Sequence, residues 1–189
     1  MNGIICLETE WEHTVKSNRL SLHTKSMLDF LEKSWNCKVI YRRVATKSEL
    51  QYYLTRFRNA EYKDYSIFYL SFHGDTHSIQ LEGENKNENK ISLSDLAEMS
   101  NGTFTDKFVH FSSCRTFLGS NKELEHFKEE TGATSISGYT KSVDCILSVI
   151  NDLSYFDQIF RHKTKKTYLA SAMDKYYGGL GKELGFRIL

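Results

Sequence analysis

The chain lacks several features that would point to a particular class of protein. It contains no proline among 189 residues, and its charges almost cancel, with 25 basic against 24 acidic residues and a formal net charge of +1. The absence of proline excludes a rigid proline-rich linker. The balanced charge gives no overall field for DNA, RNA or an anionic membrane, so we expect no nucleic-acid and no membrane partner. No apolar run approaches the roughly 18 residues that a membrane-spanning helix needs.

Cysteine is also scarce, and its four occurrences form no CxxC pair. Their wide spacing argues against a zinc knuckle and against the disulfide framework of a small secreted domain. The first thirteen residues, MNGIICLETEWEH, lack the basic region and the long apolar stretch of a signal peptide. We therefore expect a cytoplasmic protein with reduced thiols. The cysteines are Cys6, Cys37, Cys114 and Cys145.

Short apolar runs alternate with amphipathic segments along the whole chain, whose length is that of one domain, predicted to span residues 1–189. The pattern predicts strands at 3–8, 37–46, 66–72, 107–113, 133–139 and 184–189. It predicts helices at 21–35, 48–58, 122–131, 145–160 and 167–177. Such alternation indicates an α/β fold with a mostly parallel sheet covered by helices on both faces.

Polar and glycine residues predict where several of these elements end. Gly132 is expected to close the helix at 122–131, and the glycines of 178–181 are expected to break the last helix. Between 79 and 91 we expect a protruding hairpin, with a short strand at 79–81 and a second strand or a helix start at Ile91. The basic run at 162–166 suits the negative end of a helix dipole, and a phosphate contact is the alternative.

Two predicted strands end in chemically reactive side chains. Residues 68–75 read FYLSFHGD and end in His73-Gly74, while residues 107–114 read KFVHFSSC and end in Cys114. Ligands of open α/β sheets bind outside the carboxyl ends of the strands, so adjacent parallel strands would bring both groups to one crevice. A free thiol is mostly protonated at neutral pH, and an imidazole can deprotonate it and later protonate a leaving amine. The pattern predicts a cysteine hydrolase, with Cys114 as nucleophile and His73 as acid/base.

Gly74 has no Cβ, so substrate could approach the main chain there. The N–H groups of Gly74 and Cys114 would then bind the oxyanion of a tetrahedral intermediate, each stabilising the transition state by about 3 kcal/mol. An isolated histidine is more often structural, and it is the pairing with Cys114 that favours catalysis for His73. His77 with Asp75 and Cys114 is an alternative metal group, but the spacing matches no established zinc site. We expect no metal and no cofactor.

A hydrophobic strand ending in His73-Gly74, with a second ending in Cys114 41 residues later, resembles the caspase-like cysteine peptidases. These include caspases, metacaspases, separase, gingipains and the bacterial CHAT peptidases. The segment 112–116, SSCRT, shares Cys-Arg with the caspase signature Q-A-C-[RQG]-G, which has its histidine about 50 residues upstream. The resemblance implies a three-layer α/β/α sandwich with a mostly parallel central sheet.

The resemblance also implies where substrate binds. Segment 137–144, SGYTKSVD, is similar to the segment that lines the primary specificity pocket in separase-like and CHAT members. A carboxylate at Asp144 would there select Arg or Lys. The alternative for Asp144 is an N-cap of the helix that follows, and the two roles are compatible. We expect Ser113, Arg115 and Tyr139 to contact substrate as well.

Taken with the residues, the resemblance predicts a cysteine endopeptidase that cleaves a protein substrate after a basic residue. Among CHAT-like bacterial proteins it implies antiviral defence or regulated cell death, by cleavage of a neighbouring effector, with an activating partner. The segment 115–134 is short and largely helical, so we expect a chain that is not cut during maturation. The alternative is a catalytically silent caspase-like or flavodoxin-like interaction module that binds a partner or ligand in the same crevice.

Overall fold

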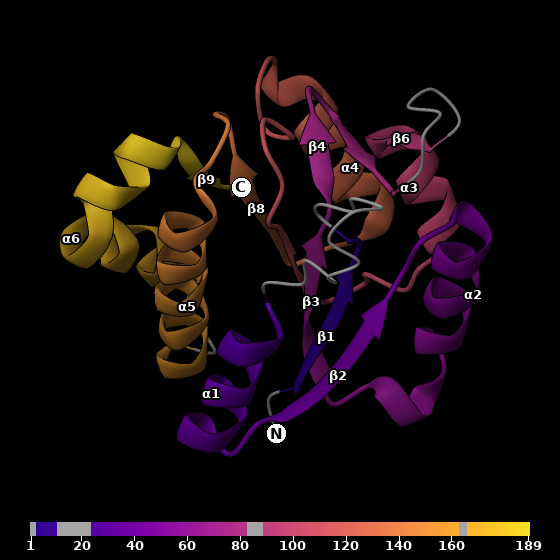
Figure 1. The fold of residues 1–189 in the computed structure, drawn as a ribbon, viewed down its shortest axis with the longest axis horizontal. Coiled ribbons are helices and arrows are strands. Elements are labelled where there is room, and N and C mark those ends of the chain that lie inside the picture. Colours follow the sequence, from indigo (N-terminus) through magenta and orange to yellow (C-terminus); the bar gives the residue numbers. More distant parts are fainter. Residues whose placement is uncertain (1–2, 11–23, 83–88, 163–165) are drawn as a thin grey trace, which may run out of the picture.

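A six-stranded sheet forms the centre of the computed structural model, which describes residues 3–10, 24–82, 89–162 and 166–189 (Figure 1). The strand order is β2-β1-β3-β7-β8-β9, and neighbouring strands are parallel except that β9 is antiparallel to β8. The strands are β1 (Gly3–Glu8), β2 (Lys38–Arg43), β3 (Tyr65–Ser71), β7 (Phe108–Phe111), β8 (Ser135–Tyr139) and β9 (Phe186–Ile188). The predicted α/β fold with a mostly parallel sheet is confirmed.

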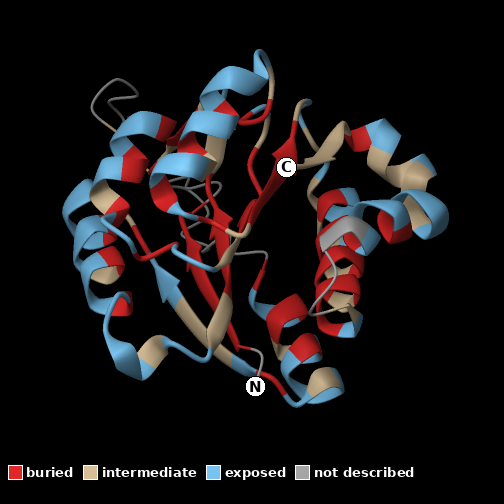
Figure 2. Cartoon of the chain, turned by 180° about the vertical axis from the view of Figure 1, so that it is seen from behind, coloured by how far each residue is buried: buried red, intermediate tan, exposed pale blue. Residues whose placement is uncertain are grey.

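Helices cover both faces of this sheet (Figure 1). They are α1 (Lys25–Trp35), α2 (Lys47–Phe57), α3 (Leu93–Ser100), α4 (Asn121–Thr131), α5 (Cys145–Arg161) and α6 (Lys166–Leu184), with a 3₁₀ turn η1 at Ala60–Tyr62. Side chains alternate along β1, so Ile5 joins a core with α2, α3 and α4, whereas Ile4 joins a core with α1, α5 and α6. The central strands are consequently buried on both sides (Figure 2).

A second, three-stranded antiparallel sheet follows β3; it contains the two strands of the predicted hairpin, in which Ile79 is opposite Ile91, and adds a third strand. It consists of β4 (His73–Asp75), β5 (Ser78–Gln80) and β6 (Lys90–Ser92). Ile91 lies in β6, and α3 begins directly after it, so both alternatives for this position are present in succession. The polar turn at 83–88 lies outside the described residues. His73 therefore starts a short strand, where the sequence predicted only the end of β3.

The helix ends agree with prediction at α4 but not at α6. Gly132 closes α4 with φ +67°, in the left-handed region that glycine adopts without strain. The predicted break at 178–181 is wrong, because α6 continues to Leu184. Each helical glycine costs about 1 kcal/mol, whereas burial of Leu169 and Met173 in the core shared with α5 stabilises by about 1.5–3 kcal/mol each. Of the basic run at 162–166, residues 163–165 lie outside the described residues.

Candidate active site

His73 and Cys114 lie at the same edge of the sheet. β3 and β7 are parallel neighbours in which Leu70 is opposite Phe111, and the Ser112 N–H continues the pairing by donating to the Leu70 carbonyl at 2.9 Å. His73 and Cys114 each follow three residues after the Leu70–Phe111 pair. The structure thus brings the two predicted catalytic residues to the carboxyl ends of adjacent strands, where open α/β sheets bind ligands.

Gly74 packs directly against the loop that carries the thiol. A Cβ placed on Gly74 would lie 2.4 Å from the Cys114 carbonyl oxygen, 2.5 Å from Thr116 Oγ1 and 2.8 Å from Ser113 Cβ. These distances leave no room for any side chain. The space beside the Gly74 Cα is therefore filled by protein atoms, which corrects the reason we gave for a glycine here, the approach of substrate. The oxyanion role of the Gly74 and Cys114 N–H groups stays a prediction.

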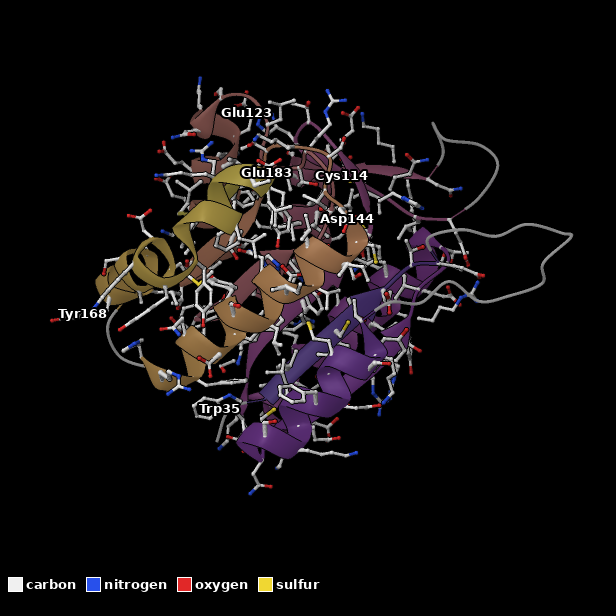
Figure 3. All side chains as sticks on the ribbon, turned by 60° about the vertical axis from the view of Figure 1, so that its left-hand side comes forward. Trp35, Cys114, Glu123, Asp144, Tyr168 and Glu183 are labelled. Carbon is white, nitrogen blue, oxygen red and sulfur yellow. The ribbon has the colours of Figure 1, made fainter. Side chains whose placement is uncertain are left out.

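The Cys114 thiol is half-buried, and a main-chain donor lies beside it. The Val143 N–H points at Cys114 Sγ with an N–S distance of 3.4 Å. Figure 3 shows Cys114 and Asp144, the residue after Val143, on the same side of the molecule where α5 begins. A hydrogen-bond donor at sulfur stabilises a thiolate, the reactive form of cysteine.

Arg115, the residue after the candidate nucleophile, has an unusual main-chain conformation. Its φ of +60° is uncommon for a residue other than glycine, and its N–H is held by the Lys141 carbonyl at 3.0 Å. The Arg115 side chain is exposed, with Nη2 3.8 Å from Oδ1 of Asp75. A main-chain donor at Thr76, together with Lys90 and Arg115, lowers the pKa of Asp75. Arg115 therefore lies at the rim of the site, where a substrate-contacting residue is expected.

The side chains of Ser113 and Tyr139, which were expected to contact substrate, lie inside the protein. Both side chains are fully buried. Ser113 Oγ lies 2.7 Å from Thr116 Oγ1, within the loop. The Tyr139 hydroxyl accepts from Asn151 Nδ2 at 3.0 Å and donates to the Asp152 carboxylate. Their polar atoms are bonded inside the protein, as buried donors and acceptors generally are.

Asp144 is the N-cap of α5, as one of its two predicted roles requires. Its Oδ1 accepts from the N–H groups of Ile146 at 2.9 Å and Leu147 at 3.0 Å. The residue is exposed, so its carboxylate does not lie at the bottom of an enclosed pocket. The preceding residue, Val143, donates its N–H to the Cys114 sulfur, so Asp144 lies near the candidate nucleophile.

A buried cluster of polar side chains that was not predicted from the sequence surrounds Asp152. His110 Nε2 lies 2.6 Å from Oδ1 of Asp152, and the hydroxyls of Tyr69 and Ser112 each donate to Oδ2 at 2.7 Å. Tyr139 also donates to this carboxylate, and all of these side chains are buried. Burial acts to raise the pKa of Asp152, but His110 and the hydroxyl donors outweigh it and hold the pKa below its ordinary value.

The periodicity did carry a signal for this cluster. Asp152 stands four residues before Phe156 and seven before Ile159, on the buried stripe of α5. His110 stands between the buried residues Val109 and Phe111 of a central strand. A charged or polar residue at a buried position of a helix or strand needs a hydrogen-bond partner. Asp152 and His110 are such residues, and each is the other's partner.

Glu10 is a second missed residue, at the carboxyl end of β1. β1 pairs with β3 so that Glu8 is opposite Ser71, and Glu10 and His73 each follow two residues after that pair. Glu10 is only 4% exposed, and its Oε2 lies 2.9 Å from Nη2 of Arg43. Its Oε1 is buried and has no hydrogen-bond partner among the described residues. Glu10 thus supplies a buried acceptor at the edge where His73 lies.

The alternative metal group gains no support. Within the described ranges, no three or more histidine, cysteine, aspartate or glutamate side chains are arranged to hold a metal ion. His77, the proposed member, instead places its ring against Gly119, where a Cβ would lie 3.0 Å from His77 Cε1.

The comparisons with known proteins identify a family but no activity. None of the described helices is both long and apolar enough to cross a membrane. No curated protein matches the sequence. A family model described as a family of unknown function, DUF6642, matches residues 2–189, which is nearly the whole chain. The chain therefore belongs to the DUF6642 family.

Proposed function

We propose that this protein is a caspase-like cysteine endopeptidase in which Cys114 is the nucleophile and His73 the acid/base. One observation carries the proposal: the two residues follow adjacent parallel strands, and Gly74, next to His73, packs against the main chain of the half-buried Cys114. The helix–sheet–helix layering agrees with the sandwich that the resemblance implies. The proposed caspase-like assignment and the activity depend on this constellation, since fold alone does not determine function.

The proposed reaction follows from these groups. The Cys114 thiolate attacks the carbonyl carbon of the scissile peptide, a C–S bond forms, and the carbonyl electrons move to oxygen. The N–H groups of Gly74 and Cys114 stabilise that oxyanion. The C–N bond breaks as His73 gives its proton to the leaving amine. Water then attacks the thioester, His73 accepts a proton from it, and the C–S bond breaks to release the acid and restore the thiolate.

Two features of the described residues favour this chemistry at Cys114. The Val143 N lies 3.4 Å from Sγ, so a main-chain donor faces the proposed nucleophile. The left-handed conformation of Arg115 makes the chain turn immediately after the nucleophile, and such outliers cluster at active sites. Burial raises the pKa of the other three cysteines, Cys6, Cys37 and Cys145, and so disfavours their thiolate forms.

For specificity we propose cleavage after Arg or Lys, recognised by the carboxylates of Asp144 and Glu10. Asp144 lies at the start of α5 beside Val143. Glu10 offers a buried oxygen without a partner in the described part of the chain, and a buried unpaired acceptor favours a bound cation. Glu10 is the stronger candidate energetically, because a charge pair gains more when desolvated than at an exposed position.

A peptide-library digest tests the proposal. Purified protein is incubated with a mixture of peptides, with and without an activating cell extract, and the products are identified by mass spectrometry. We expect new carboxyl termini at Arg and Lys with the wild-type protein and with Cys145→Ala, and none with Cys114→Ala. Cleavage that persists in Cys114→Ala, or an uncleaved library under both conditions, would contradict the peptidase. The latter result would favour the interaction module that uses the same crevice.

A further inference from the structure

The Asp152 carboxylate connects α5 to three strands of the central sheet. On β3 the donor is the Tyr69 hydroxyl, on β7 it is His110, and on β8 it is the Tyr139 hydroxyl. The Ser112 hydroxyl donates from the residue directly after β7. An ionised carboxylate only accepts hydrogen bonds, and all four neighbours can donate. A fully buried charge with this many donors is held in one position by the surrounding structure.

Ser112 stands where the regular pairing of β7 ends. Phe111 is the last residue of β7 opposite β3, and the Ser112 N–H makes the next main-chain bond, to Leu70. The chain then turns through Cys114 and Arg115, whose φ is +60°. The bond from Ser112 Oγ to Asp152 Oδ2, at 2.7 Å, is thus a side-chain tie two residues before the thiol.

The residue before the N-cap of the same helix also contacts the thiol. Asp144 caps the first turn of α5, and the preceding Val143 N–H lies 3.4 Å from Cys114 Sγ. Asp152 follows eight residues after the cap on the same helix. A shift of α5 or of the strand end would therefore change the position of the sulfur relative to Val143.

We propose that Asp152 is a positioning residue for Cys114, holding the start of the nucleophile loop through the Ser112 hydroxyl and the start of α5 through its own helix. The inference rests on the proposed function, because it assigns Asp152 a role at that site. Displacement of a reacting atom by about 1 Å can cost about a hundredfold in rate, so a small shift of the sulfur has a measurable effect.

The chain offers a matched pair of variants to test this role. Ser112→Ala and Tyr69→Phe each remove one hydroxyl that donates to the same oxygen, Oδ2, at the same 2.7 Å. Tyr69 lies within β3, paired with Cys6 of β1 and His110 of β7, so its main chain is fixed without the hydroxyl. Ser112 lies beyond the last β7 pair, so its main chain depends more on the side-chain bond.

The experiment measures the rate of Cys114 alkylation by a peptidyl-arginine chloromethyl ketone at a series of reagent concentrations. This series gives two separate quantities, the rate at saturation and the reagent concentration at half-saturation. We expect Ser112→Ala to lower the saturating rate about tenfold or more with an unchanged half-saturating concentration, and Tyr69→Phe to stay within about twofold. Thermal melting of both variants verifies that they are folded and lose similar stability. Equal effects of the two variants, or no effect of Ser112→Ala, would overturn the positioning role.

Two further measurements distinguish a failure of the positioning role from a failure of the proposed peptidase activity. Asp152→Asn tests the carboxylate itself and should lower the saturating rate at least as far as Ser112→Ala; a wild-type rate in a folded Asp152→Asn protein would overturn the proposal. Chloroacetamide, which needs no peptide recognition, measures the Cys114 alkylation rate by mass spectrometry. A wild-type protein that reacts with chloroacetamide but not with the peptidyl reagent refutes the peptidase, while a slower chloroacetamide rate in Ser112→Ala than in Tyr69→Phe still supports positioning.

Discussion

Gly74 and the Cys114 carbonyl oxygen are so close that a Cβ on Gly74 would lie 2.4 Å from that oxygen. The contact joins the strand that begins with His73 to the loop that carries the thiol. The conflicting atom belongs to the main chain, so it cannot move aside by a simple rotamer change. The relative placement of the two candidate catalytic residues therefore depends on a glycine at position 74.

Gly74→Ala is expected to destabilise the protein by about 1–3 kcal/mol through overpacking. It should also slow Cys114 alkylation, because the loop must move to admit the methyl group. Urea unfolding gives the stability, and alkylation kinetics of the folded protein give the reactivity. A stable Gly74→Ala protein with wild-type reactivity would show that the contact does not set the position of Cys114.

Gly179→Ala is the matched control, and it is expected to increase the free energy of unfolding rather than lower it. Gly179 lies inside α6, and a Cβ built there meets no atom within 4 Å. Alanine in a helix interior is favoured over glycine by about 0.5–1 kcal/mol, so this variant should be more stable in urea by that amount. A loss of stability would indicate that the helix does not pass through Gly179 as described.

The two proposed roles of Asp144, helix N-cap and substrate recognition, can be separated with one variant that keeps the N-cap and one that removes it. Asparagine is about as good an N-cap as aspartate, whereas alanine costs about 1 kcal/mol. Asp144→Asn should therefore keep wild-type stability and Asp144→Ala should not. Because Asp144 is exposed, removal of its charge should reduce the preference for Arg over Leu substrates by no more than about fivefold. Thermal melts and kcat/KM on paired peptides measure the two effects, and an unchanged preference would leave Asp144 a helix cap alone.

Glu10→Gln should have the larger effect on specificity. The Glu10 carboxylate is buried, and loss of its charge should reduce the preference for Arg over Leu about tenfold or more. Glu82→Gln is the control, because Glu82 also binds Arg43, at 2.6 Å, but is more exposed. The same two peptides serve as substrates. Equal loss of preference in both variants would assign the effect to Arg43 rather than to a cation site at Glu10.

Asp152 is expected to make the free energy of unfolding decrease as the pH falls into the acid range. Its pKa is lower in the folded protein than its ordinary value of about 3.9, so the unfolded chain binds the proton more tightly. This stabilisation is complete above about pH 4 and is lost as the pH falls towards the folded-state pKa. Urea unfolding between pH 7 and pH 3 should show a smaller decline for Ser112→Ala, which lacks one of the donors that lower this pKa. An identical decline would contradict the assignment.

The hydrophobic periodicity predicted the order of strands and helices. β1, β3 and β7 lie within the sheet and α5 packs on it, so their apolar residues follow a clear pattern in the sequence. It failed where tertiary packing opposes local preference, as at the glycines of α6. It also missed β4, since His73–Asp75 has no strand pattern of its own and is a strand only through its pairing with β5.

For the site, strand order decided what could be predicted. A histidine and a cysteine after apolar runs predicted the His73 and Cys114 positions, because parallel neighbours share an edge. Ser113 neighbours Cys114, and Tyr139 lies in the segment that is similar to a specificity pocket, but neither fact shows which way a side chain points, and both side chains are buried. Asp152 was missed because its partners come from β3, β7 and β8, which meet only in the folded chain.

The most direct test of the central claim is the rate of Cys114 alkylation by a peptidyl-arginine reagent in wild type, His73→Ala and Cys145→Ala, read by peptide mapping. The account predicts labelling at Cys114 in wild type and Cys145→Ala, and at least about a hundredfold slower labelling in His73→Ala, in line with the usual contribution of acid–base catalysis. Equal labelling of wild type and His73→Ala would contradict it, because Cys114 would then react without the imidazole.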